Sequence, residues 1–163
     1  MCLPSAPPRD KMIRLNKEKY SGKPEVDMSL IRDISLAPAG ELKISWVERN
    51  MPVLRAIGEE FRRTRPFEGL RVALSVHLEA KTAYLCRVME MGGAEMYVTG
   101  SNPLSTQDDV AAALASGGMQ VFGRHGCDME EYEQCLCSAL EIGPNLIVDD
   151  GGDMVHLMHT RYT

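Results

Sequence analysis

The chain has 163 residues, which suits one domain with a sizeable buried core. Its 23 acidic residues outnumber its 18 lysines and arginines, and the net charge of −5 without a basic block argues against nucleic acid or an anionic membrane as a main partner. No apolar run approaches the roughly 20 residues that cross a bilayer. The amino terminus lacks the apolar core of a signal peptide, so we expect a cytoplasmic protein.

The five cysteines are an odd number, which argues against a disulfide framework. Cys86 and Cys135 have apolar neighbours on predicted helices and are expected in the core. Cys127 precedes a predicted helix, which leaves open a mildly acidified thiol at that position.

The first part of the chain predicts a tail followed by helical structure. Residues 1–25 are rich in proline and lysine with little hydrophobic periodicity, and we expect a loose tail there. Apolar residues then recur at helical spacing from Leu42 to Phe61. This pattern predicts one amphipathic helix over about residues 41–63, disturbed at Pro52, with Trp46 packing it on the body of the domain.

From residue 70 onward, predicted strands and helices alternate. Four short apolar runs predict strands: Leu70–Val76, Glu95–Thr99, Met119–Phe122 and Asn145–Val148. Three stretches between them predict helices: Ala80–Met91, Thr106–Ser116 and Met129–Leu140. Capping-box spacing occurs twice at these helix starts, in Ser105 with Asp108 and in Asp128 with Glu131. Repeated strand–helix–strand units predict an α/β fold, a three-layer Rossmann-like domain with a parallel sheet and the N-terminal helices packed on it.

Polar side chains follow each predicted strand at the point where it ends. They are His77 and Glu79, Ser101 and Asn102, Arg124 and His125, and Asp149 and Asp150. Because the carboxyl ends of parallel strands meet at one edge of a sheet, we expect these side chains to line one rim. Such a rim suits a small polar ligand and acid–base chemistry.

The stretch Asp149–Asp153, with the sequence DDGGD, is the most informative in the chain. Two glycines let the backbone turn sharply and approach a ligand, and residues 154–159 predict the start of a helix. In a purely structural alternative, Asp153 caps that helix and Asp149 is solvated, but a cap needs only one of these residues. His77 alone would be interpreted as a structural histidine, and its place opposite Asp150 favours an acid–base role.

Two other kinds of site are not expected. Asp153, His156 and Thr160, with His159, share a helix face, but no further strong ligand is evident and we predict no metal site. No G-x-G-x-x-G sequence follows a strand, so the chain has no dinucleotide fingerprint and no cofactor-binding residues of its own are predicted.

Four segments together carry a resemblance to a known family. They are His77–Ala83 (HLEAKTA), Gly100–Leu114 (GSNPLSTQDDVAAAL), Glu130–Tyr132 (EEY) and Asp149–Asp153 (DDGGD). In this order they resemble S-adenosylhomocysteine hydrolase, over about Met28 to the end of the chain. The resemblance implies reversible cleavage of S-adenosylhomocysteine to adenosine and homocysteine with tightly bound NAD, by a full-length enzyme that is a homo-oligomer.

The same resemblance implies roles for individual residues. Asp150 matches a carboxylate placed for proton transfer at the ribose, and His77 matches a histidine near C5′ that protonates the leaving thiolate and activates water. The implied substrate-binding residues are Glu79, Lys81, Asn102, Ser105, Thr106, Gln107 and Asp149.

Two departures from the family qualify these roles. Many members have threonine at the position of Glu79 and an acid at the position of Lys81. Because a lysine can only donate hydrogen bonds, it would suit the 6-keto oxygen of hypoxanthine, and S-inosylhomocysteine is the alternative substrate. In a third interpretation, Lys81 pairs with Glu79 or points to solvent.

The second departure is length, because family members are more than twice as long and carry an NAD-binding domain that this chain lacks. We therefore expect residues 26–163 to be a partial substrate-binding domain that is inactive alone. The competing class is a non-catalytic nucleoside-binding module.

Overall fold

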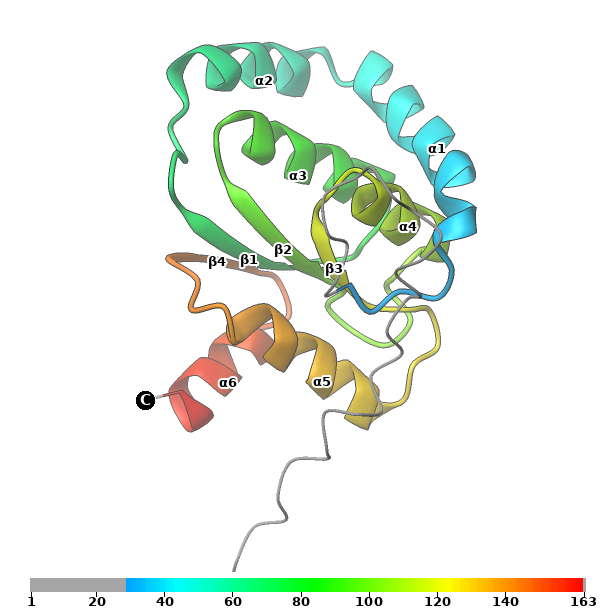
Figure 1. Ribbon diagram of the computed structural model, residues 1–163, viewed down its shortest axis with the longest axis vertical. Coiled ribbons are helices and arrows are strands. Elements are labelled where there is room, and N and C mark those ends of the chain that lie inside the picture. The colour runs from blue at the N-terminus through cyan, green and yellow to red at the C-terminus, as the bar shows by residue number, and fades with distance from the viewer. Residues whose placement is uncertain (1–28, 163) are drawn as a thin grey trace, which may run out of the picture.

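The structure is a computed structural model that describes residues 29–162, and the predicted tail at residues 1–25 lies outside them (Figure 1). After a short 3-10 turn at Ile34–Leu36, two helices precede the first strand: α1 (Ala37–Asn50) and α2 (Pro52–Thr64). Strands and helices then alternate in the order β1 (Arg71–Ser75), α3 (Ala80–Met91), β2 (Glu95–Thr99), α4 (Asp108–Ser116), β3 (Gln120–Phe122), α5 (Met129–Leu140), β4 (Leu146–Asp149) and α6 (Asp153–Arg161).

The four strands form one parallel sheet in the order β3-β2-β1-β4, which confirms the predicted α/β class. Strand β1 lies between two neighbours and is covered on both faces, so Val72, Ala73 and Leu74 are all fully buried. A strand buried on both faces needs a continuous apolar run, which is the pattern in the sequence.

The direction of chain travel explains how the helices are distributed. From β1 to β3 the strands are added on one side, and α3 and α4 cover one face (Figure 1). The chain then returns to place β4 on the other side of β1, and α5 and α6 cover the opposite face (Figure 1). Right-handed crossovers in opposite directions place their helices on opposite faces. The point between β1 and β4, where the direction reverses, is where open α/β sheets bind ligands.

Helices α1 and α2 form an additional layer outside α3 and α4 (Figure 1). A Cβ atom on Gly40 would lie 1.9 Å from the carbonyl oxygen of Asp109, so α1 meets the start of α4 at a distance that only glycine permits. The predicted packing of N-terminal helices on the domain is confirmed, although they pack on other helices rather than on the strands.

One prediction for this region is confirmed in part and another is wrong. The disturbance expected at Pro52 is present, but it divides the helix expected over about 41–63 into two, because Pro52 takes the first position of α2, where its missing N–H costs nothing. Trp46 is 61% exposed and does not anchor α1. Instead Gly40, Ile44 and Val47, at positions i, i+4 and i+7, form the buried stripe of α1.

The helix caps give one confirmation and one correction. Asp128 and Glu131 form the predicted capping box, in which the Glu131 amide donates to the Asp128 carboxylate at 2.9 Å. The Ser105–Asp108 box is wrong, because α4 begins at Asp108 after Gln107, and the Ser105 hydroxyl bonds inside its own loop.

The remaining observations on the fold concern the cysteines and the lengths of the helices. Cys86 and Cys135 are buried as expected. Burial raises the pKa of the Cys127 thiol, so the acidified-thiol alternative is wrong. Among residues 29–162, no helix is long and apolar enough to cross a membrane.

Candidate functional site

The four strands end at nearly the same level. Ser75 of β1 pairs with Thr99 of β2 and with Asp149 of β4, and Thr99 pairs with Phe122 of β3. Three of the predicted site residues follow these positions closely, Asp150 by one residue, His77 by two and Asn102 by three, so the sheet gathers them at one rim. The rim is built around the reversal point between β1 and β4.

The turn after β4 is organised by Asp149. Its Oδ1 accepts the amides of Gly151 and Gly152 at 3.2 and 3.0 Å, and its Oδ2 accepts the amide of Val155 at 3.0 Å. Gly152 has a φ of 83°, which glycine adopts without strain. Asp149 is therefore not simply solvated, and Asp153 does not cap α6. Instead, both carboxylate oxygens of Asp149 hold the turn and the start of α6. Its substrate-binding role stays a prediction.

Asp150 and His77 differ from Asp149 because their side chains are free. The amide of Asp150 donates to the Ser75 carbonyl at 3.2 Å, which continues the pairing with β1. Both side chains are exposed, and neither makes a hydrogen bond or ion pair to any other residue in 29–162. They follow neighbouring strands, whose spacing is about 4.8 Å. At the reversal point there are therefore an imidazole and a carboxylate that have no partner within the described part of the chain.

The loop after β2 is held by its own side chains. The Ser105 hydroxyl donates to the Asn102 carbonyl at 2.9 Å and accepts the Asn102 amide at 3.1 Å. Thr106 is buried against Gly100, where a Cβ atom would lie 2.6 Å from Thr106 Oγ1. The Asn102 Oδ1 accepts the Leu104 amide at 2.9 Å. Ser105 and Thr106 thus shape the loop, and their contact with substrate stays a prediction.

Segments far apart in sequence fix the start of α4. Lys43 of α1 lies with Nζ 2.7 Å from Asp109 Oδ2 and donates to Gln107 Oε1 at 3.1 Å. Arg32 lies with Nε 2.6 Å from Asp108 Oδ2, and Asp108 Oδ1 accepts the His125 amide at 2.8 Å. Lys43 and Arg32 were not predicted from the sequence, because nothing in their local pattern shows which loop they contact.

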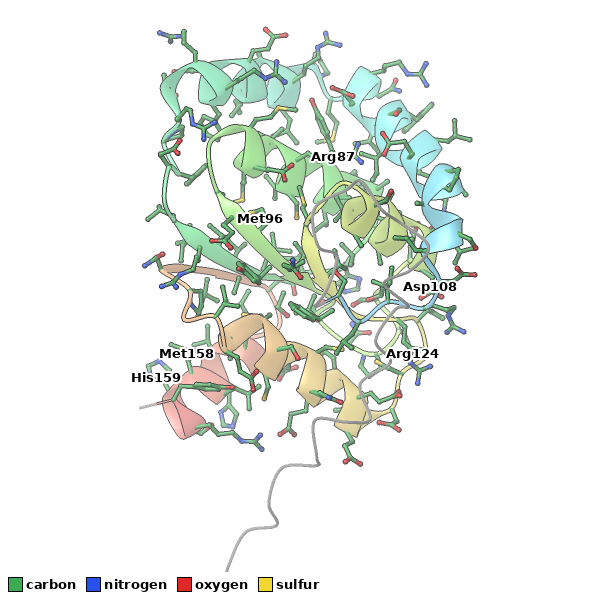
Figure 2. All side chains as sticks on the ribbon, viewed as in Figure 1. Arg87, Met96, Asp108, Arg124, Met158 and His159 are labelled. Carbon is green, nitrogen blue, oxygen red and sulfur yellow. The ribbon has the colours of Figure 1, made fainter. Side chains whose placement is uncertain are left out.

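The loop after β3 lies beside this cluster. Figure 2 shows Asp108 and Arg124 on the same side of the molecule. Arg124 forms an ion pair with Glu131 of α5, and this contact lowers the pKa of the Glu131 carboxyl. The guanidinium of Arg124 is therefore engaged by the capping box of α5.

Glu79 and Lys81 lie at the start of α3. Glu79 Oε1 accepts the amides of Lys81 and Thr82 at 3.1 and 3.3 Å and so caps the helix. The Lys81 Nζ lies 3.9 Å from the same oxygen, in an exposed ion pair. Both residues also line a groove of about 460 Å³ between α1 and the start of α3, which we call the α1–α3 groove. Its lining residues are Leu42, Lys43, Trp46, Val47, Glu79, Ala80 and Lys81.

Residues of α6 lie elsewhere. In Figure 2, His159 lies on the opposite side of the molecule from Asp108 and Arg124. Within the described part of the chain, no three His, Cys, Asp or Glu side chains come together as metal ligands. Among residues 29–162, none of the four strands leads through a G-x-G-x-x-G turn into its helix.

Comparison with known proteins identifies the family. A family profile described as S-adenosyl-L-homocysteine hydrolase matches residues 28–163. The chain belongs to this family, a family of hydrolases. The resemblance drawn from the sequence is confirmed.

The curated relatives of this chain are named as one of two enzymes. The chain is 51% identical over 136 residues to the S-inosyl-L-homocysteine hydrolase of Methanococcus maripaludis, covering 83% of this chain and 33% of the relative. It is 53% identical over 131 residues to the adenosylhomocysteinase of Pyrococcus abyssi, with coverage of 80% and 31%. The chain spans about a third of the length of these relatives.

Proposed function

We propose that residues 26–163 form part of the substrate-binding domain of an enzyme that cleaves a nucleosyl-homocysteine thioether to a nucleoside and homocysteine. The observation that carries this proposal is the free pair His77 and Asp150 at the reversal point of the sheet, in a chain of this family. Asn102, Gln107 and Glu79 stand on the same rim as candidate contacts to the ribose or base.

His77 is proposed as the acid and base at C5′. When the C4′ proton is lost and the bond between C5′ and sulfur breaks, a C4′=C5′ double bond forms and the imidazolium donates its proton to the leaving thiolate. The neutral imidazole then takes a proton from the water that adds at C5′, while a proton returns to C4′. An exposed imidazole without a partner among residues 29–162 is free to do both.

Asp150 is proposed to hold and move a proton at the ribose hydroxyls. Its backbone is fixed by the hydrogen bond to Ser75, while its carboxylate is free to accept from the ligand. Asp149, one residue earlier, keeps the turn in shape and so aims Asp150.

The resemblance also implies NAD, which would supply oxidation and reduction of the ribose. Residues 29–162 contain no G-x-G-x-x-G turn that would hold its pyrophosphate. We propose that the described residues bind substrate and move protons, and that they do not complete turnover alone.

A second substrate, the S-inosyl thioether, is favoured by Lys81. Lys81 lines the α1–α3 groove, and its exposed ammonium can only donate, which suits the 6-keto oxygen of hypoxanthine. We expect Lys81→Glu to shift preference toward the adenosyl thioether, measured as the ratio of kcat/KM for the two substrates. An unchanged ratio would remove Lys81 from base selection.

The proposal is tested on the native protein purified from its source, with its intact mass measured on the same sample. We expect hydrolysis of the S-adenosyl or S-inosyl thioether by a polypeptide larger than this chain. His77→Ala and Asp150→Asn should lower kcat/KM by about 10²- to 10⁴-fold. The control Glu130→Gln, an exposed residue of α5, should leave activity unchanged. Absence of thioether hydrolysis in the native protein would contradict the proposal.

A further inference from the structure

We propose that Tyr132 of α5 is a positioning residue for Asp150, because its hydroxyl holds the turn Asp149–Asp153 in place through Asp153. This inference rests on the proposed function, in which the Asp150 carboxylate moves a proton at the ribose. It gives α5 a part in the reaction, although no role at the site was predicted for Tyr132 from the sequence.

The turn between β4 and α6 is pliable by itself. Its two adjacent glycines, Gly151 and Gly152, restrict the backbone less than any other residue would. The Asp149 carboxylate accepts only amides of the turn and of the first turn of α6. These hydrogen bonds therefore shape the turn from within, but they do not fix its far end relative to the sheet.

Two contacts attach the turn to other elements. Beyond the pairing of β4 with β1, the Asp150 amide donates to the Ser75 carbonyl at 3.2 Å. At the far end of the turn, the Tyr132 hydroxyl donates to Asp153 Oδ2 at 3.0 Å, from α5, which lies against α6 (Figure 1). Within the described part of the chain, the second contact is the only side-chain hydrogen bond from this turn to an outside element.

Tyr132 can hold the turn because it is itself fixed. It is 5% exposed and belongs to the buried cluster that also contains Ala73, Phe122 and Met154. A buried hydroxyl needs a partner, and the Asp153 carboxylate is that partner. Burial and the hydrogen bond to Asp153 raise the pKa of Tyr132, so the hydroxyl keeps its proton and remains a donor.

The direction of the Asp150 side chain depends on these attachments. Its carboxylate has no partner among residues 29–162, so only the backbone of the turn decides where it points. With the Ser75 contact on one side and the Tyr132 contact on the other, that backbone is held at both ends. A displacement of about 1 Å at a reacting group can lower a rate by up to about 10²-fold. Loss of the Tyr132 hydroxyl should therefore be felt at Asp150.

Variants of the native enzyme test this role in the reaction. Tyr132→Phe keeps the buried ring and removes only the hydroxyl. We expect kcat for thioether hydrolysis to fall by about tenfold while KM stays within about twofold. The reason is that the variant misplaces a proton-transfer group without removing a contact to the substrate.

The matched control is Tyr97→Phe. Tyr97 is also buried, and its hydroxyl donates to the Glu95 carboxylate at the amino end of β2, the edge of the sheet opposite the rim. Both variants lose a hydrogen bond from a buried tyrosine to a carboxylate, so both should lower the melting temperature of the enzyme. Only Tyr132→Phe should lower kcat.

Double variants identify the residue through which Tyr132 acts. In the Asp150→Asn background, where the carboxylate is already lost, Tyr132→Phe should lower the single-turnover rate by less than about twofold. Asp153→Ala removes the acceptor of the same hydrogen bond and should lower kcat by about tenfold, and adding Tyr132→Phe to it should lower kcat no further. Asp153→Asn keeps an acceptor and should retain more activity than Asp153→Ala.

The outcomes separate this inference from the proposed function. A Tyr132→Phe enzyme that melts at a lower temperature but keeps its kcat would overturn the inference and leave Tyr132 a purely structural role. A loss of about tenfold that persists in the Asp150→Asn background would also overturn it, because Tyr132 would then act on another group. If Tyr132→Phe does not fold, Asp153→Ala gives the same measurement. Absence of thioether hydrolysis in the unmodified enzyme would instead overturn the proposed function, and this inference with it.

Discussion

The loops after β2 and β4 flank the end of β1 and nearly touch, since a Cβ atom on Gly151 would lie 3.5 Å from the Ser101 carbonyl oxygen. They are nevertheless built in opposite ways. In the β2 loop the side chains of Ser105 and Thr106 are buried, and the Ser105 hydroxyl hydrogen-bonds the backbone of the loop itself. In the β4 loop Asp149 is partly exposed and Asp150 is exposed, and among residues 29–162 only the Asp149 carboxylate accepts hydrogen bonds.

The difference separates residues that hold the shape of a loop from residues that are available for chemistry. A polar group that is buried must find a partner in the protein, and it is then unavailable to a ligand. A polar group that is exposed and unpartnered is free to act. The β2 loop therefore behaves as a scaffold, and the β4 loop presents the reactive carboxylate on a turn that its neighbour holds.

The largest expected effect compares one glycine in each loop. Gly100→Ala places a methyl group 2.6 Å from Thr106 Oγ1 and 2.8 Å from Ser105 Oγ, and we expect it to lower the free energy of unfolding by about 1–3 kcal/mol. Gly151→Ala meets its nearest atom at 3.5 Å and should change it by less than about 1 kcal/mol. Urea unfolding of both variants measures the difference, and equal losses would refute the distinction between the loops.

The next effect compares the two adjacent carboxylates. Asp149→Ala removes the acceptor of three backbone amides and should cost about 1–2 kcal/mol of unfolding free energy. Asp150→Ala removes no protein contact among residues 29–162 and should stay within about 0.5 kcal/mol, although we expect it to abolish activity of the native enzyme. Thermal unfolding of both variants measures the contrast, and a more destabilising Asp150→Ala would reverse the assignment.

A smaller effect concerns the support of the β4 loop from α5. The Tyr132 hydroxyl donates to Asp153 Oδ2 at 3.0 Å, and burial together with this bond raises the pKa of Tyr132. Tyr132→Phe should lower the free energy of unfolding by about 1 kcal/mol. If Asp153→Asn, which keeps an acceptor, costs as much as Tyr132→Phe, the hydrogen bond is not the cause.

The smallest effect lies outside both loops. Arg87 of α3 donates to Glu41 of α1 at 2.9 Å, and this contact lowers the pKa of Glu41 below its usual value of 4.5. The pair therefore stabilises the fold above that value, and its contribution is lost as the pH falls through the lowered pKa. Glu41→Gln should cost less than about 1 kcal/mol at pH 7, because Glu41 is half-exposed. The difference in melting temperature between wild type and variant should shrink at pH 3, and a constant difference would exclude the ion pair.

The alternation of strands and helices was predictable from local pattern. Apolar runs at β1 and β4, and the capping box at Asp128, are short-range signals, and they place the rim correctly. That the polar residues after each strand lie at one rim could be predicted from topology, because the carboxyl ends of parallel strands lie at the same edge of the sheet.

The sequence-based predictions that failed concern residues whose positions depend on tertiary contacts. Trp46 fits a helical period as well as Ile44 does, and only the close approach at Gly40 decides which face of α1 is buried. Lys43 and Arg32 contact loops more than 60 residues away, which no local spacing encodes. Asp149 could be recognised as a turn residue only once its three amide partners were in place.

The strand order also has a consequence for biosynthesis. Translation delivers β1 first, and β2 and β3 follow to pair on one side, whereas the other edge of β1 stays open until β4 emerges. His77 therefore leaves the ribosome long before Asp150, and the two meet only when the last strand inserts beside the first. Until then the nascent chain carries an unpaired, apolar strand edge at Val72–Leu74, the kind of surface that invites misassociation and chaperone binding.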